Sequence, residues 1–359
     1  MRHVGSFLAG WKGLGRFWIG LLIFLSIAAG LLQALGPPSR ITLASKEPIA
    51  QAVPPPTVAS GPDLNGHVAL HPPLHPGRPG RDTPGPIADP DPSLLDTYPN
   101  DPDRKLPRIA ADGRVPMAAY AAGFDPTSMR PKVGMLIAGL GMSEADSLAA
   151  IKDLRGGVTL AFSPYAPDIR HLLETARMTE HEYLLAIPME PQGYPVNDPD
   201  DRHALMTSLP PAENLNRLRW VLAQLTGYVG ITNALGPMRG ERLAAVSDQF
   251  APVLNEAAQR GLLFVDARIA QPTLPRAWNR SVDVAIDDDP VDASALDQKL
   301  DLLTHTALDK GTALGIVWIP RPMTLSRVAA WTNSLAAKGL ALAPVSALVL
   351  PPAKQEATK

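Results

Sequence analysis

The sequence contains no cysteine among its 359 residues. Without thiols the chain cannot form a disulfide framework, a thiolate zinc site, an iron–sulfur cluster or a cysteine nucleophile. Charged residues make up 19% of the chain, below the roughly 25% of an average soluble domain, and aromatic residues only 5%. The formal net charge of −2 gives no electrostatic reason to bind nucleic acid, and we expect no nucleic-acid partner.

A long apolar run lies near the N-terminus, from Phe17 to Leu35. Its length suits a helix that crosses the hydrocarbon core of a membrane. Basic residues precede the run and Gly-Pro-Pro ends it, which predicts a cytoplasmic N-terminus and an external remainder. The run is long for a cleaved signal peptide. We therefore expect residues 1–36 to form an uncleaved signal anchor with a transmembrane helix at 17–35.

Proline is abundant, with 39 residues or about twice the usual share, and about half of them fall between Pro37 and Pro126. Such runs favour extended, solvated chain. Residues 37–105 are therefore predicted to be a disordered linker. The histidines at 67, 71 and 75 have helical spacing, but the prolines between them prevent the helix that a metal site would need. Residues 106–130 contain apolar anchors and are predicted to dock on the domain that follows.

Residues 131–352 alternate between strand and helix patterns, which leaves 353–359 as a tail. A repeated β-α pattern predicts a parallel sheet, either doubly wound or closed as a barrel. The strand-like runs are Val133–Ala138, Val158–Phe162, Tyr183–Ile187, Tyr228–Ile231, Leu262–Asp266, Leu314–Trp318, Leu340–Val345 and a weaker run at Val282–Ile286.

Polar side chains follow several of these strands, where either architecture places its working residues. Asp266 and Glu190 are the candidate catalytic residues, and we expect them to lie near one another. Asn233, Arg268 and Tyr165 are the candidate substrate-binding residues. A structural alternative stays open, in which Asp266 caps a turn and pairs with Arg268.

A glycine-rich turn follows the first strand, at residues 139–141. A dinucleotide-binding loop would need a third glycine at position 144, where the chain has Glu144. A tight strand-to-helix turn capped by Ser143 accounts better for these residues.

Five segments resemble the divergent polysaccharide deacetylase family, a set of bacterial envelope proteins. They are VTLAFSPYAP (158–167), HEYLLAIPMEPQG (181–193), GYVGITNALG (227–236), GLLFVDAR (261–268) and APVSALV (343–349). The resemblance implies an α/β fold, a NodB-like distorted (β/α) barrel, behind the transmembrane helix and the linker. It also implies work on cell-envelope polysaccharide, with the anchor in the bacterial inner membrane and the globular domain in the periplasm. The activity it implies is hydrolysis of amide bonds in polysaccharide with a divalent metal such as zinc.

The positions that would hold this metal lack ligand side chains. The family has aspartates or histidines where this chain has Ala138, Gly139, Ala186, Ala234 and Ile319. A deacetylase needs its metal to activate a water, and a zinc site takes three protein ligands. We therefore expect neither a metal nor another cofactor. The acidic run at 287–289 is interpreted as a solvated loop rather than a cation site.

Two functions remain open at this stage. One is an enzyme that acts on envelope polysaccharide, although the missing ligands make deacetylation doubtful. The other is a non-catalytic module that binds a glycan or an envelope protein.

Overall fold

The computed structural model describes residues 79–99, 101–199, 202–289 and 291–353. The anchor predicted at 17–35 and most of the predicted linker lie outside these ranges. Within them, no helix combines the length and apolarity needed to span a membrane.

A two-stranded antiparallel ribbon lies ahead of the predicted domain. It consists of β1 (Leu95–Tyr98) and β2 (Asp101–Pro107), preceded by the short helix η1 (Pro92–Leu94). Leu94 is fully buried, so this segment packs into the folded unit. The predicted linker boundary at residue 105 is therefore wrong, because regular structure begins at about residue 92.

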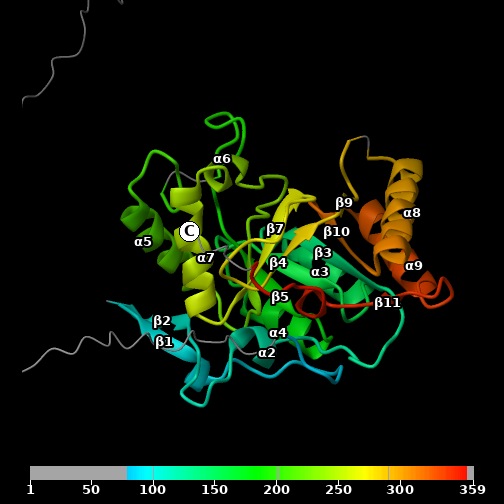
Figure 1. Ribbon diagram of the computed structural model, residues 1–359, viewed down its shortest axis with the longest axis horizontal. Coiled ribbons are helices and arrows are strands. Elements are labelled where there is room, and N and C mark those ends of the chain that lie inside the picture. Colours follow the sequence, from blue (N-terminus) through cyan, green and yellow to red (C-terminus); the bar gives the residue numbers. More distant parts are fainter. Residues whose placement is uncertain (1–78, 100, 200–201, 290, 354–359) are drawn as a thin grey trace, which may run out of the picture. The chain divides into compact units, whose positions relative to one another are not determined.

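The main sheet is parallel throughout, as the repeated β-α pattern predicted. Its strand order is β8-β7-β6-β5-β4-β3-β10-β9, and β11 pairs with β3 (Figure 1). The strands are β3 (Lys132–Leu140), β4 (Thr159–Phe162), β5 (Tyr183–Ala186), β6 (Gly230–Thr232), β7 (Leu263–Ile269), β8 (Asn279–Val282), β9 (Val284–Ala285), β10 (Thr312–Val317) and β11 (Ala341–Leu342).

Asp283 joins the two ends of this strand order, because it is the residue between β8 and β9. Its amide donates to the carbonyl of Leu314 at 2.8 Å, and its carboxylate accepts from the amide of Leu314 at 2.9 Å. The two edges of the sheet are thus neighbours in sequence and in space. The sheet is a nearly closed barrel, which confirms the (β/α)-barrel prediction over the doubly wound alternative.

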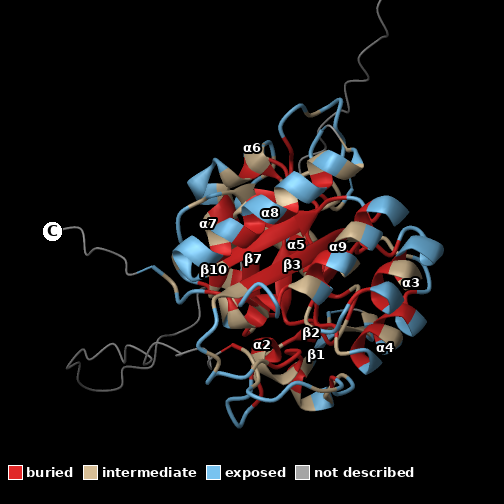
Figure 2. Cartoon of the chain, turned by 90° about the vertical axis from the view of Figure 1, so that its right-hand side faces the viewer, coloured by how far each residue is buried: buried red, intermediate tan, exposed pale blue. Residues whose placement is uncertain are grey.

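Alternate residues of each strand serve two hydrophobic cores, as the period-2 geometry of a strand requires. In β3, Met135 and Ile137 belong to the core between barrel and helices, whereas Leu136 and Ala138 belong to the core inside the barrel. Figure 2 shows the buried strands in red, with helices whose outer faces are exposed. These helices are α3 (Glu144–Asp153), α4 (Arg170–Met178), α5 (Pro211–Leu222), α6 (Glu241–Ala244), α7 (Ser247–Gln259), α8 (Ala293–Lys310) and α9 (Pro322–Ser334). Ser143 caps α3 as predicted, by accepting from the amide of Asp146.

The pole at which the strands begin is closed by segments from both ends of the domain. They are α2 (Pro116–Ala119) and η2 (Val345–Ala347), whose Met117 and Val345 share the core inside the barrel. Glu182 joins them: its carboxylate accepts from the amide of Ala122 at 3.1 Å and from the amide of Ser346 at 2.9 Å. The hydroxyls of Ser346 and Thr159 also donate to it, and burial raises the pKa of Glu182.

Candidate functional site

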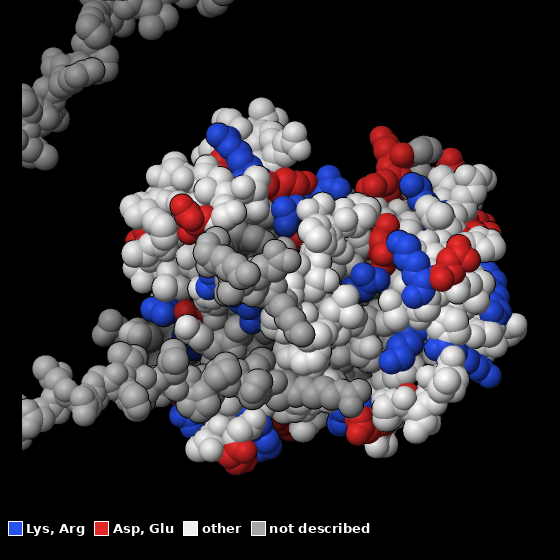
Figure 3. All heavy atoms as spheres, in the orientation of Figure 1, with Lys and Arg blue, Asp and Glu red and all other residues white. Residues whose placement is uncertain are grey.

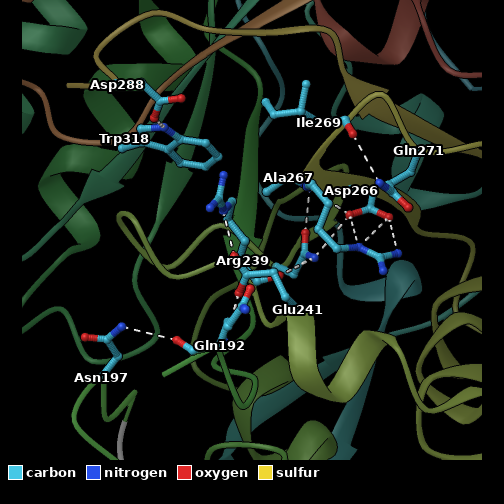
Figure 4. Close-up of polar contacts among 12 residues, drawn as sticks. Gln192, Asn197, Arg239, Glu241, Asp266, Ala267, Ile269, Gln271, Asp288 and Trp318 are labelled. Atoms are coloured by element: carbon cyan, nitrogen blue, oxygen red, sulfur yellow. Dashed lines mark hydrogen bonds and ion pairs between the residues drawn. The ribbon is translucent and has the colours of Figure 1, made fainter. Parts of the chain in front are cut away.

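The mouth of the barrel, where the strands end, brings three of the predicted site residues together. Arg268 donates to both carboxylate oxygens of Asp266, at 2.6 Å from its Nη2 and 3.0 Å from its Nε. Asn233 donates to Asp266 at 3.2 Å and accepts from the amide of Ala267 at 2.7 Å. Figure 4 shows this network around Asp266. Asp266 and Asn233 are each 1% exposed, so the network supports the strand ends from beneath the surface.

Glu190 lies in a separate network. Its Oε2 accepts from the amide and the hydroxyl of Thr207, at 2.6 and 2.7 Å, and its Oε1 pairs with Arg242 at 3.0 Å. The side chain is 4% exposed. Asp266 pairs with Arg268 and Glu190 pairs with Arg242. The two carboxylates therefore belong to separate ion pairs.

Tyr165 also lies in surroundings of its own. Its ring lies beside Trp220, with centroids 6.4 Å apart, and the ring of His203 stacks on Trp220 at 3.4 Å. Arg104, from β2, lies 5.1 Å from the centre of the same indole. Tyr165 thus belongs to an aromatic cluster around α5, which sequence periodicity alone could not indicate.

A cavity of about 260 Å³ opens at the mouth. Its lining comes from four strand ends and is largely apolar: Gly139, Met142, Ser163, Leu235, Gly236, Trp318, Ile319 and Pro320. None of the five predicted site residues lines it. Met142 is 63% exposed, so the rim itself presents an apolar side chain to solvent.

Gly139 tests whether this mouth fits a metal of the deacetylase type. A Cβ on Gly139 would lie 2.8 Å from the carbonyl oxygen of Trp318, and its φ of +73° disfavours larger residues. A carboxylate ligand at this position therefore has no room. In the described ranges, no three His, Asp or Glu side chains gather as a metal site would require. The residues at the mouth do not fit the divalent metal that the resemblance implied.

Trp318 is the large side chain at the mouth that sequence reasoning did not single out. Its indole N–H donates to Asp288 at 3.0 Å, and its backbone amide donates to Asp287 at 2.7 Å. Arg239 lies 5.4 Å from the ring centre and pairs with Glu241 at 2.8 Å, as Figure 4 shows. The side chain is therefore held on several sides.

The interpretation of 287–289 as a solvated loop is wrong for its first residue. Asp287 is 5% exposed and accepts from the amides of Trp318 and Ile319. Burial raises its pKa, although the two amides and Arg321 act in the opposite direction. The signal in the sequence was weak, because these partners lie about thirty residues away on the next strand.

Comparisons with known proteins agree with the barrel fold. The sequence profile described as "Divergent polysaccharide deacetylase" matches residues 135–349. The crystal structure of an uncharacterized protein from Agrobacterium tumefaciens C58 is 31% identical, with a TM-score of 0.62, and covers 68% of this chain and 100% of its own. A family 4 carbohydrate esterase from Streptomyces lividans in complex with acetate is 18% identical, covers 60% of this chain and 97% of its own, and has a TM-score of 0.37. No curated protein matches the chain.

Proposed function

Because the chain belongs to the divergent polysaccharide deacetylase family, we propose that it is an envelope protein that binds polysaccharide at the mouth of its barrel without metal-dependent deacetylation. The proposal includes an inner-membrane anchor at residues 17–35 and a periplasmic barrel. Support for this topology comes from the apolar run and the positive charges that precede it.

The observation that carries the proposal is the close approach of Trp318 to Gly139. A metal-dependent deacetylase uses its metal to lower the pKa of a bound water and to polarise the acetyl carbonyl. Here a Cβ at 139 would already lie 2.8 Å from a backbone oxygen, so the Trp318 segment occupies the space of a ligand side chain.

The remaining acids are poor substitutes for metal ligands. Arg268 neutralises Asp266 and Arg242 neutralises Glu190, and both carboxylates are nearly inaccessible. Removing either arginine from its carboxylate would leave a buried charge without compensation. We therefore assign Asp266, Asn233, Arg268 and Glu190 a positioning role beneath the mouth rather than contact with a ligand.

The mouth cavity suits a sugar better than an ion. Ligand sites are mostly apolar with a few polar groups, and here Met142, Leu235 and Ile319 line the cavity together with Ser163. The apolar carbon face of a sugar ring fits such a lining, and its hydroxyls remain free to reach Ser163 and solvent.

The test compares two exposed methionines in the full-length protein. Met142 lines the mouth and is 63% exposed, whereas Met178, at the end of α4, is 71% exposed. A carboxylate at the mouth opposes the burial of an apolar sugar face. Met142→Glu is expected to weaken the binding of acetylated polysaccharide at least about tenfold, and Met178→Glu to leave it unchanged, as measured by affinity electrophoresis.

The same preparation answers the catalytic question. We expect no acetate release from acetylated glycans, with or without added zinc. Acetate release that a chelator abolishes would overturn the non-catalytic proposal and favour a metal-dependent deacetylase instead. Equal binding by both methionine variants would remove the mouth as the binding site.

A further inference from the structure

Two hollows lie at the pole opposite the mouth, where the strands begin. One has a volume of about 450 Å³ and is lined in part by Asp82, Lys132 and Trp278. The other, of about 420 Å³, is lined in part by Arg130 and Arg155. Phe124 lines both hollows, so they adjoin at this residue, and we call the two together the polar groove. Each hollow falls within the roughly 300–1,000 Å³ of small-ligand sites.

Several polar groups in the first hollow make no hydrogen bond or ion pair with the residues that the structure describes. In the described part of the chain, the exposed carboxylate of Asp82 makes no hydrogen bond or ion pair, and the indole N–H of Trp278 donates to no other group. The Nζ of Lys132 lies over the face of Phe124, at 4.9 Å from the ring centre. By contrast, the Nη1 and Nη2 atoms of Arg81 already donate to protein groups, the carbonyls of Gly85, Pro86 and Ala122.

The charges of the polar groove favour a neutral ligand. Its cations are Arg81, Lys132, Arg130 and Arg155, and its carboxylates are Asp82, Asp125 and Glu180. Such near balance attracts neither a polyanion nor a polycation. On the face of the molecule seen in Figure 3, basic and acidic side chains are likewise interspersed.

We propose that the polar groove is a second carbohydrate-binding site, which takes a neutral sugar chain. This inference rests on the proposed function insofar as the ligand is a polysaccharide. The ring of Trp278 provides an apolar face for a sugar ring while its N–H remains available to a hydroxyl. Asp82 accepts from sugar hydroxyls and Lys132 donates to sugar oxygens. The second hollow, which adjoins the first at Phe124, gives room for further units of the chain.

The test uses the full-length protein and two probes, N-acetylated chito-oligosaccharides and cello-oligosaccharides, in calorimetric titrations. Asp82→Asn is expected to weaken binding about fivefold, because the variant keeps the shape but loses the charge-assisted acceptor. Trp278→Ala is expected to weaken it at least about tenfold, and Trp278→Phe to restore most of the affinity by keeping an aromatic face. Asp309→Asn is the control, because Asp309 is exposed on α8 and lines neither hollow.

The outcomes separate this site from the mouth. If binding is lost with Met142→Glu but is unchanged by Asp82→Asn and Trp278→Ala, the polar groove is not a sugar site and the proposed function stands. If the two pole variants lose binding and Met142→Glu does not, the polar groove stands and the mouth assignment fails. Absence of binding to both probes, together with binding of an extended peptide that Trp278→Ala abolishes, overturns the carbohydrate assignment. Trp278→Phe and Asp82→Asn keep the test informative if Trp278→Ala does not fold.

Discussion

At the mouth of the barrel, Asp266 and Glu190 each face an arginine, whereas at the opposite pole Glu182 is buried among neutral donors alone. At the mouth a guanidinium lies beside each carboxylate, 2.6 Å from Asp266 and 3.0 Å from Glu190. Glu182 is surrounded by two amides and two hydroxyls, and its pKa is raised because burial outweighs them. The comparison teaches that one barrel holds buried acids in two ways, either beside an arginine or among neutral donors alone.

The largest expected effect comes from breaking the ion pair at the mouth. Asp266→Ala leaves Arg268, which is 16% exposed, without its carboxylate, and we expect the free energy of unfolding to fall by about 3 kcal/mol. Urea denaturation measures this loss. Asp297→Ala is the matched control, because its pair with Arg327 is exposed on both sides, and a loss of no more than about 0.5 kcal/mol is expected. Equal losses in the two variants would contradict the buried character of the pair.

Two glycines with similar φ angles test whether the mouth has room for a side chain at position 139. Gly139 has φ +73° and its Cβ would meet Trp318, whereas Gly311 has φ +78° and open space around its Cβ. Gly311→Ala is expected to cost about 1 kcal/mol through backbone strain alone, and Gly139→Ala about 2.5 kcal/mol because overpacking is added. The difference between the two melting temperatures isolates the contact with Trp318. A difference of zero would mean that the mouth has room for a ligand side chain.

The stability of Glu182→Gln at different pH values tests how the buried carboxylate at the pole contributes to folding. Its amide nitrogen would face a backbone N–H of Ser346 or Ala122, and the unmet donor costs about 2 kcal/mol. Because the folded pKa of Glu182 lies above the ordinary 4.5, its stabilising contribution is complete below that pH and is lost as pH rises through the folded pKa. The penalty of the variant should therefore shrink between about pH 5 and about pH 8, as chemical denaturation at the two values would show.

Glu256 is a buried carboxylate whose pKa is shifted in the opposite direction to that of Glu182. Arg219 and Arg260 lower its pKa despite burial, so its contribution is present above 4.5 and is lost as pH falls. Glu256→Gln should consequently show a penalty that falls toward acid pH. The same pH trend in both variants would contradict the distinction between paired and unpaired carboxylates.

The fold was largely predictable because its signals are local. Short apolar runs indicated β3, β4, β5 and β7 close to their observed positions. The ribbon of β1 and β2 was missed because β2 begins Asp-Pro-Asp-Arg and ends in proline, a composition typical of linkers that a two-stranded edge tolerates. The weak run at 282–286 proved to be parts of two strands, because Asp283 turns its side chain to the amide of Leu314.

The site was predictable only in part, since its decisive contacts are distant in sequence. The rule that strand ends meet correctly brought Asn233, Asp266 and Arg268 together. It did not show that they would be buried, or that Glu190 would bind Thr207 from a later loop and Arg242 from α6. Those contacts depend on how the loops fold over the mouth, and no local pattern in the sequence encodes that arrangement.

The single residue between β8 and β9 has a consequence for how the protein behaves in a crowded compartment. A sheet with free edges offers rows of unpaired amides and carbonyls on which another chain can form a strand. Here the two edge strands follow one another around Asp283, and the backbone of Asp283 itself pairs with β10. The main sheet thus exposes little edge, and edge-to-edge aggregation would first require the segment at 279–285 to detach.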